Sequence, residues 1–160
     1  MIRAATTADA AAIAAIYNHY VENTVVTFEE EPIGRREMAR RIREISARLP
    51  FLVAVEDREV VGYTYANSWK TRSAYRYSVE STVYLGPAHV GRGWGTQLYT
   101  ILLAELRQRG CHAVIGGVSL PNAASVALHE KMGFAKVAHF PEVGRKFGRW
   151  IDVGYWTVVL

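Results

Sequence analysis

The chain has 160 residues, which is about the length of one domain. Half of the residues are hydrophobic and 21% are charged, a composition that excludes an intrinsically disordered chain and a chain embedded in a membrane. The net charge of +4 favours an acidic partner. No uncharged apolar stretch approaches the roughly 20 residues that span a bilayer, and the N-terminus lacks the pattern of a secretory signal. We therefore expect one cytoplasmic domain, residues 1–160, with no membrane partner.

Cys111 is the single cysteine of the chain, so neither an intramolecular disulfide nor a cysteine-cluster metal site can form. One cysteine also agrees with a reducing compartment. A lone cysteine at the entry to a strand is more often a core residue than a reactive one, and we predict a core position. We expect no metal.

The first third of the chain predicts a short strand at residues 2–4, a helix capped by Thr7 or Asp9 that continues through Tyr20, and a second helix over 34–49. Apolar side chains recur along the second helix at helical spacing: Met38, Ile42, Ile45, Leu49. The segment also contains six arginines, which we interpret as the solvent-exposed face of the helix. The alternative is that they form a patch that binds nucleic acid or phosphate. Because no aromatic residues alternate with them, we expect no nucleic-acid partner.

The rest of the chain alternates strands with helices. The predicted elements are a β-hairpin over 51–66, a strand over 75–85, a glycine-rich loop over 86–95, a helix capped by Thr96 that ends at Gly110, a strand over 113–118, a helix over 121–132, a strand over 135–140, a loop over 141–150 and a closing strand over 151–160. This order predicts an α/β fold. Its central sheet is mixed and largely antiparallel, with helices on both faces.

The glycine-rich loop is the most specific chemical signal in the residues themselves. Gly91, Gly93 and Gly95 alternate with Arg92 and Trp94, so the backbone has no Cβ atoms where a ligand must come close. The helix that follows directs its free N–H groups and its dipole toward the same place, which suits a pyrophosphate. The spacing matches neither the lysine-bearing loop of nucleotide triphosphatases nor the dinucleotide-binding fingerprint.

The same segment, together with a later helix, resembles the GNAT superfamily of acyl-CoA-dependent N-acetyltransferases. The residues that carry this resemblance are Thr82–Leu85, Gly91–Thr96, Asn122, Ser125, His129, Lys131, Gly133 and Phe134. The resemblance implies a GNAT-like sheet, with a pair of splayed strands that admits the pantetheine arm of acetyl-CoA, the cosubstrate. Val90 departs from the superfamily pattern, which has an arginine or glutamine there.

A closer similarity, over nearly the whole chain, is to the phosphinothricin N-acetyltransferase subfamily. It rests on Thr27–Glu29 with Pro32, on Tyr75–Tyr84, on Asn122–Phe134 and on Gly148–Trp156. The subfamily acetylates the primary amine of phosphinothricin, methionine sulfoximine or related glutamate-like compounds, and its members are commonly homodimers. Phe147 and Ile151 stand where the herbicide-resistance enzymes tend to have histidines. Methionine sulfoximine or sulfone is therefore as plausible an acceptor as phosphinothricin.

The resemblance also assigns roles to individual residues. The catalytic pair is Glu80, as general base for direct attack of the amine, and His129, at the position of a superfamily tyrosine that protonates the leaving thiolate. The residues implied for acetyl-CoA are Val83, Tyr84, Leu85, Val90, Gly91, Arg92, Gly93, Trp94, Gly95, Thr96, Asn122, Ser125 and Lys131. Those implied for the amine substrate are Phe28, Glu29, Arg72, Tyr75, Arg76, Glu80, Ser81 and Thr82.

Two other functions stay open at this point. An N-acetyltransferase for peptide or protein N-termini would use the same fold with a more open groove. A catalytically silent acyl-CoA sensor would keep the glycine-rich loop without using Glu80. The arginine and tyrosine residues that precede Glu80 argue against a cationic acceptor such as a polyamine, since guanidinium groups pair with carboxylates and phosphinates.

Overall fold

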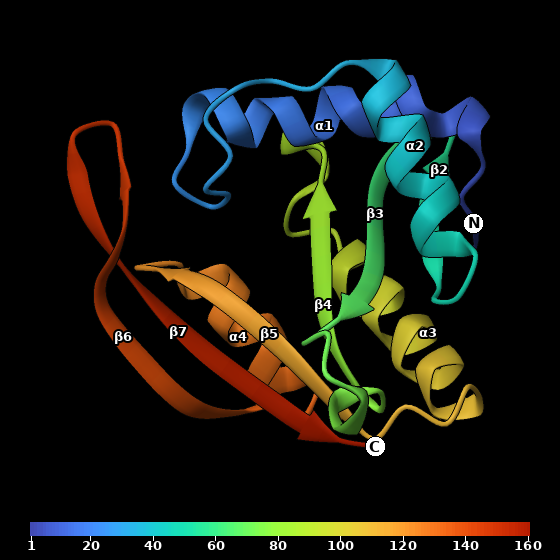
Figure 1. The fold of residues 1–160 in the computed structure, drawn as a ribbon. Coiled ribbons are helices and arrows are strands. Elements are labelled where there is room, and N and C mark those ends of the chain that lie inside the picture. The colour runs from blue at the N-terminus through green and yellow to red at the C-terminus, as the bar shows by residue number, and fades with distance from the viewer.

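A computed structural model describes all 160 residues, which build one seven-stranded sheet in the order β1-β2-β3-β4-β5-β7-β6 (Figure 1). The strands are β1 (Ile2–Ala4), β2 (Phe51–Glu56), β3 (Glu59–Ser68), β4 (Ser78–Leu85), β5 (Ala113–Leu120), β6 (Ala135–Lys146) and β7 (Arg149–Val159). Every neighbouring pair is antiparallel except β4 and β5, which run parallel. The predicted mixed, largely antiparallel sheet is confirmed.

Helices cover both faces of this sheet, as predicted. They are α1 (Ala10–Asn23), α2 (Arg35–Ser46), α3 (Trp94–Gln108) and α4 (Ala123–Lys131), with 3₁₀ turns at Thr7–Asp9, Ser73–Tyr75 and Pro87–His89. Successive side chains of a strand point to opposite faces. On β2, Phe51 and Val53 therefore pack with α1 and α2, whereas Leu52 and Ala54 pack with α3. None of the helices is long and apolar enough to cross a membrane.

The amphipathic pattern of α2 is confirmed, because Met38 and Ile42 are buried in the core. On its outer side the arginines are partly neutralised by neighbouring carboxylates. Arg40 bonds Glu37, and Arg41 bonds both Glu37 and Glu29. Cys111 is half-buried and packs against the core on the α3 side, in agreement with its predicted position.

The predicted loop over 141–150 is wrong, because β6 and β7 continue through it as one long hairpin that turns at Phe147 and Gly148. Pro141 signals a loop because it has no N–H to donate to a strand ladder. In the structure it lies within a register break between Phe140 and Gly144, where no ladder bond is lost. Figure 1 shows this hairpin extending away from the rest of the sheet.

Two predicted boundaries also need correction. The strand assigned to 75–85 begins at Ser78, because residues 73–75 form a 3₁₀ turn. Thr96 does not cap a helix: α3 already begins at Trp94, after Gly93 in a left-handed conformation with φ of 85°. Left-handed backbone suits glycine, so Gly93 rather than a capping hydroxyl sets the start of α3.

The parallel pair β4–β5 holds together for only three residues on each strand. Its last partners are Glu80 and Ile115, and beyond them the strands diverge (Figure 1). On the far side, β4 stays paired with β3 along its whole length. The sheet is therefore open at one point in its middle, on the C-terminal side of Glu80.

Candidate active site

Two adjoining hollows occupy the opening between β4 and β5. One, which we call the splay cavity, has a volume of about 430 Å³ and lies between residues 80–84 of β4 and 117–119 of β5. The other, the loop groove, has a volume of about 540 Å³ and runs along the glycine-rich loop and the start of α3. They share lining residues, among them Val83, Asn122 and Ser125. A ligand can therefore extend from one hollow into the other.

Glu80 lines the splay cavity at the point where the two strands separate. Burial raises the pKa of its carboxyl group, while the positive charge of Lys70 acts in the opposite direction. Gly117 of β5 faces the carboxylate: a Cβ there would be in ordinary van der Waals contact with Glu80 Oε1 at 3.5 Å and would lie closer, at 3.1 Å, to the Tyr155 ring. A partly desolvated carboxylate with a raised pKa accepts a proton more readily than an exposed one.

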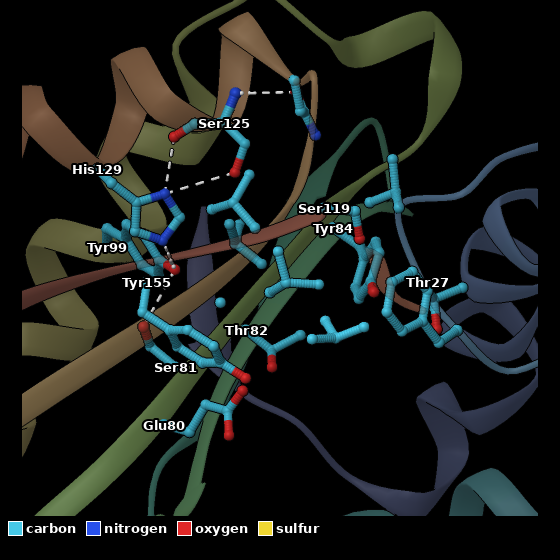
Figure 2. Close-up of a pocket in the computed structure, with 18 residues that line it drawn as sticks. Thr27, Glu80, Ser81, Thr82, Tyr84, Tyr99, Ser119, Ser125, His129 and Tyr155 are labelled. Atoms are coloured by element: carbon cyan, nitrogen blue, oxygen red, sulfur yellow. Dashed lines mark hydrogen bonds between the residues drawn. The ribbon is translucent and has the colours of Figure 1, made fainter. Parts of the chain in front are cut away.

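A chain of hydrogen bonds lines the splay cavity from α4 to Ser81, the neighbour of Glu80 on β4 (Figure 2). His129 Nδ1 lies 2.7 Å from the carbonyl oxygen of Ser125, which can only accept, so Nδ1 carries the proton. The free Nε2 then accepts from the hydroxyl of Tyr99 at 3.0 Å, and the Tyr99 oxygen accepts from Ser81 at 3.1 Å. Burial lowers the pKa of His129, which favours this neutral ring.

Gly116 makes this arrangement possible. A Cβ at this position would lie 2.4 Å from His129 Nε2, closer than any side chain tolerates. Three aromatic contacts hold the ring in place, since His129 packs edge-on against both Tyr99 and Phe134, and Tyr99 stacks on Phe134. The ring is only 3% exposed, and its position is fixed by packing as much as by hydrogen bonds.

The backbone of β4 offers free N–H groups to the opening. The N–H of Gly86, just after β4, donates to Val61 of β3 at 2.8 Å. Because N–H groups alternate sides along a strand, those of Val83 and Leu85 point away from β3. The pairing with β5 has already ended at Glu80, so neither amide has a strand partner. They are available to a carbonyl oxygen placed between the strands.

The loop groove has the features of an anion site. Gly91 and Gly93 both have positive φ, 78° and 85°, and open space surrounds Gly91 where a side chain would be. The N-terminus of α3 follows directly, so its unpaired N–H groups and dipole favour a phosphate. Lys131 also lines the groove.

Comparison with known proteins identifies the family. The family described as "Acetyltransferase (GNAT) domain" matches residues 2–154. The chain belongs to the GNAT acetyltransferase family. It is 42% identical to a phosphinothricin N-acetyltransferase of Streptomyces viridochromogenes, over 97% of this chain and 85% of that protein. It is 39% identical to an L-methionine sulfoximine/L-methionine sulfone acetyltransferase of Salmonella typhimurium, over 99% of this chain and 94% of that protein.

A solved structure agrees with this family assignment. A GNAT phosphinothricin acetyltransferase of Sinorhizobium meliloti, determined with acetyl-CoA, superposes with a TM-score of 0.97 at 35% identity, covering 100% of this chain and 88% of that one. The protein is an acetyl-CoA-dependent N-acetyltransferase, as predicted. Its own residues fit acetyl-CoA, since the loop groove offers free amides at one end and leads at the other into a cavity that holds a carboxylate.

The GNAT fold brings most of the predicted site residues to the two hollows. Those in the splay cavity are Phe28, Glu80, Ser81, Thr82, Val83, Tyr84, Asn122, Ser125 and His129. Those in the loop groove are Val83, Tyr84, Leu85, Val90, Gly91, Gly93, Gly95, Thr96, Asn122, Ser125 and Lys131.

Six predicted residues lie outside both linings: Glu29, Arg72, Tyr75, Arg76, Arg92 and Trp94. For three of them the structure shows another partner. Glu29 bonds Arg41 of α2, and Arg92 pairs with Glu56 at 2.9 Å. Arg76 lies over the Tyr77 ring. Arg72, Tyr75 and Arg76 are exposed on the segment that precedes β4.

The fold also places at the site residues that no pattern in the sequence predicted. Tyr99 and Tyr155 line the splay cavity, although they lie in α3 and β7, far from Glu80 in sequence. Lys70 is the cation whose charge reaches Glu80. Its neighbour Trp69 packs edge-on against Tyr155. No local pattern identified these residues, because only the topology brings their segments together.

Proposed function

We propose that the enzyme transfers the acetyl group of acetyl-CoA to the primary amine of a small amino acid analogue of the phosphinothricin, methionine sulfoximine or methionine sulfone type. The observation that carries this proposal is the position of Glu80. Its carboxylate lies where β4 and β5 separate, in a cavity of about 430 Å³. That cavity adjoins the loop groove, so an amine in the cavity is next to the end of acetyl-CoA that carries the thioester.

Glu80 acts as general base in this proposal. A primary amine is protonated at neutral pH, and it must lose that proton before its lone pair can attack the thioester carbon; the raised pKa of Glu80 suits it to accept the proton. As the N–C bond forms and the C–S bond breaks, the nitrogen loses its second proton, which balances the proton that the departing thiolate of coenzyme A takes up.

The free amides of Val83 and Leu85 stabilise the carbonyl oxygen as negative charge develops on it. Preorganised N–H donors of this kind need no rearrangement during the reaction. Neutral His129, with its proton on Nδ1, keeps the Tyr99 hydroxyl oriented through Nε2. We infer that His129 acts on the leaving thiolate through Tyr99, which lines the cavity between His129 and Ser81. His129 positions the Tyr99 hydroxyl, whose hydrogen turns from Nε2 to the sulfur and protonates the thiolate, and a proton that the amine has released then replaces it on Tyr99.

The loop groove is the proposed binding site for the rest of acetyl-CoA. Gly91 and Gly93 let the backbone approach the pyrophosphate, and the N-terminus of α3 supplies further N–H groups. Lys131 adds a positive charge at the groove. Arg92 is engaged by Glu56, so we expect it to contribute little.

An anionic amino acid analogue fits the surroundings of Glu80. Lys70, Arg72 and Arg76 all lie on the segment between β3 and β4, and Lys70 acts electrostatically on Glu80. The charge of Lys70 attracts a carboxylate of the acceptor, although Arg72 and Arg76 lie outside the cavity lining. Glu80 is the one acidic side chain in that lining, so the second ammonium group of a polyamine finds no carboxylate there. The named substrates of the two curated relatives belong to this class.

The test is an acceptor panel with purified enzyme and acetyl-CoA, followed by release of free thiol. The panel holds phosphinothricin, methionine sulfoximine, methionine sulfone, ordinary amino acids, a polyamine and a peptide with a free N-terminus. We expect turnover with the sulfoximine, the sulfone or phosphinothricin. Turnover with the peptide alone would replace the proposed acceptor, and silence with acetyl-CoA bound would favour an acyl-CoA sensor.

We also propose that the 160 residues form one N-acetyltransferase domain and that this domain is a homodimer. The β6–β7 hairpin extends from the sheet and exposes a set of large apolar side chains: Val137, Phe140, Val143, Phe147 and Trp150. Monomers rarely expose so many apolar residues on one element. Sedimentation of the enzyme at micromolar concentration should give twice the chain mass, and a monomer would contradict the proposal.

A further inference from the structure

We propose that Gly144 and Lys146 of β6 determine which acceptors the enzyme takes, because they position the segment 26–28 as a wall of the splay cavity. This inference rests on the proposed function in placing the acceptor in that cavity. Val26, Thr27 and Phe28 line the cavity, and Val143 of β6 lines it beside them. None of these residues belongs to the chemistry assigned to Glu80 and His129.

The ring of Phe28 fills the space that a side chain at position 144 would take. A Cβ at position 144 would lie 2.3 Å from two atoms of the ring and 3.1 Å from a third. The backbone of Gly144 does not need glycine, because its φ lies outside the positive region, unlike that of Gly148 in the turn of the same hairpin. The missing side chain therefore serves one purpose, which is to let Phe28 lie flat against β6.

Lys146 makes the second contact between β6 and this segment. Its ammonium group donates to the carbonyl oxygen of Thr27 at 2.9 Å, and the residue is only 2% exposed. Burial lowers the pKa of Lys146, whereas the charge of Glu30 raises it. A buried ammonium is costly unless it is well paired, and no carboxylate bonds this one. A purely apolar side chain would pack here at lower cost. The lysine adds two contacts: its ammonium lies over the Phe147 ring, 5.2 Å from the centroid, and it bonds Thr27, which is the contact that reaches the segment 26–28.

The same segment is fixed on its other side by the core. The Thr27 hydroxyl bonds that of Tyr17 in α1 at 2.8 Å, and Glu29 bonds Arg41 in α2. The segment is therefore held between the two helices and the hairpin. Because α1 and α2 fix only one side, the position of the Phe28 ring within the cavity depends on β6.

The consequence is a split between the two substrates. Phe28, Thr27 and Val143 line only the splay cavity, whereas Val26 lines both hollows. The contacts of Gly144 and Lys146 are with Phe28 and Thr27, on the side of the amine. A change at Gly144 or Lys146 should alter the KM of the amine and the choice among amines. It should leave the KM of acetyl-CoA unchanged.

The first experiment uses Gly144→Ala, Phe28→Ala and the double variant. The added methyl group must displace the Phe28 ring, so we expect the KM of the preferred amine to rise about tenfold in Gly144→Ala, with the KM of acetyl-CoA unchanged. In the Phe28→Ala background the same methyl group should have no further effect on the KM of the amine. Gly34→Ala is the matched control, since Gly34 has ordinary backbone angles and open space around it.

The second experiment replaces Lys146 by Met, with exposed Lys136→Met on the same strand as control. We expect faster amide hydrogen exchange at residues 25–30 in Lys146→Met only, a higher KM for the amine, and unchanged affinity for acetyl-CoA by calorimetry. The exchange measurement needs no acceptor, so it separates failure of this inference from failure of the proposed function. Sedimentation of each variant checks that assembly is the same.

Three results would overturn the inference. The first is an equal change in the KM of amine and acetyl-CoA in Gly144→Ala. The second is a methyl effect of the same size with and without Phe28. The third is unchanged hydrogen exchange at residues 25–30 in Lys146→Met, which would mean that the buried ammonium does not hold the segment.

Discussion

The loop groove and the splay cavity adjoin, but they are built in different ways. The groove is formed largely by one continuous piece of chain, from the end of β4 through the glycine loop into α3, with α4 as its second side and with Tyr20 of α1 and Val26 also in its lining. The splay cavity takes its walls from β4, β5, α3, α4, the 26–28 segment and the β6–β7 hairpin. The first is a local structure that a family can keep unchanged, whereas the second depends on how distant elements pack. The cosubstrate can therefore stay fixed while the acceptor varies.

The largest effect that separates the two hollows is expected for Glu80→Gln. Loss of the base should lower kcat by about two to four orders of magnitude, since general base catalysis contributes that much. Acetyl-CoA should bind with unchanged affinity, because Glu80 does not line the loop groove. Thiol-release kinetics and calorimetry measure the two quantities. Burial raises the pKa of Glu80, so folding disfavours its charged form, and the variant should unfold at the same or a higher temperature at pH 7.

Tyr99→Phe tests the chain of hydrogen bonds that lines the splay cavity. It leaves His129 Nε2 and the Ser81 hydroxyl without their shared partner, which should cost about 1–3 kcal/mol of stability. If Tyr99 acts on the leaving thiolate, kcat should also fall about tenfold while acetyl-CoA affinity is kept. A lower melting temperature with unchanged kcat would make the hydroxyl purely structural.

Gly91→Ala tests the loop groove alone, and the helix that it precedes supplies a matched control. Gly91 and Gly110 stand at opposite ends of α3, both have φ of 78°, and both have open space around them. Alanine in this conformation should cost about 1 kcal/mol at either position. Only Gly91→Ala should weaken acetyl-CoA binding, by a few-fold to about tenfold, because only there does a methyl group enter the groove. Equal affinity of the two variants for acetyl-CoA would show that the glycine loop does not contact acetyl-CoA.

The smallest effect is expected for Arg92→Ala. Its guanidinium group is held by Glu56 outside the groove, in an exposed pair of a kind that contributes at most about 1 kcal/mol. We expect less than about a twofold change in the KM of acetyl-CoA. A large increase would show that Arg92 leaves Glu56 to reach the phosphates.

The difference between the hollows also explains what the sequence could predict. The glycine loop, the start of α3 and the strand that holds Glu80 follow from local spacing. The structure places them as expected, except that the helix start shifts from Thr96 to Trp94 and the strand begins at Ser78, so Glu80 lies near its start. The amphipathic α2 is another local pattern. Each of these depends on residues within one or two turns of each other.

The rest of the site depends on contacts between distant segments. Tyr99, Tyr155 and Lys70 have no distinguishing local pattern, and only the sheet order brings them to Glu80. Pro141 favoured a loop, and the register break in β6 between Phe140 and Gly144 lets a strand pass through it. Glu29 lies next to a cavity residue in sequence, but its carboxylate bonds α2 instead.

The most direct test of the account is the pH dependence of kcat/KM for the amine, measured for the wild type and for Glu80→Gln. Because the pKa of Glu80 is raised above its ordinary value, we expect wild-type activity to fall as pH decreases through that raised pKa, when the carboxylate is protonated and can no longer accept a proton. The residual activity of Glu80→Gln should not show this fall in activity at low pH. It should keep the change at higher pH that comes from titration of the amine substrate itself. The same fall in activity at low pH in both proteins would contradict the assignment of Glu80 as the base.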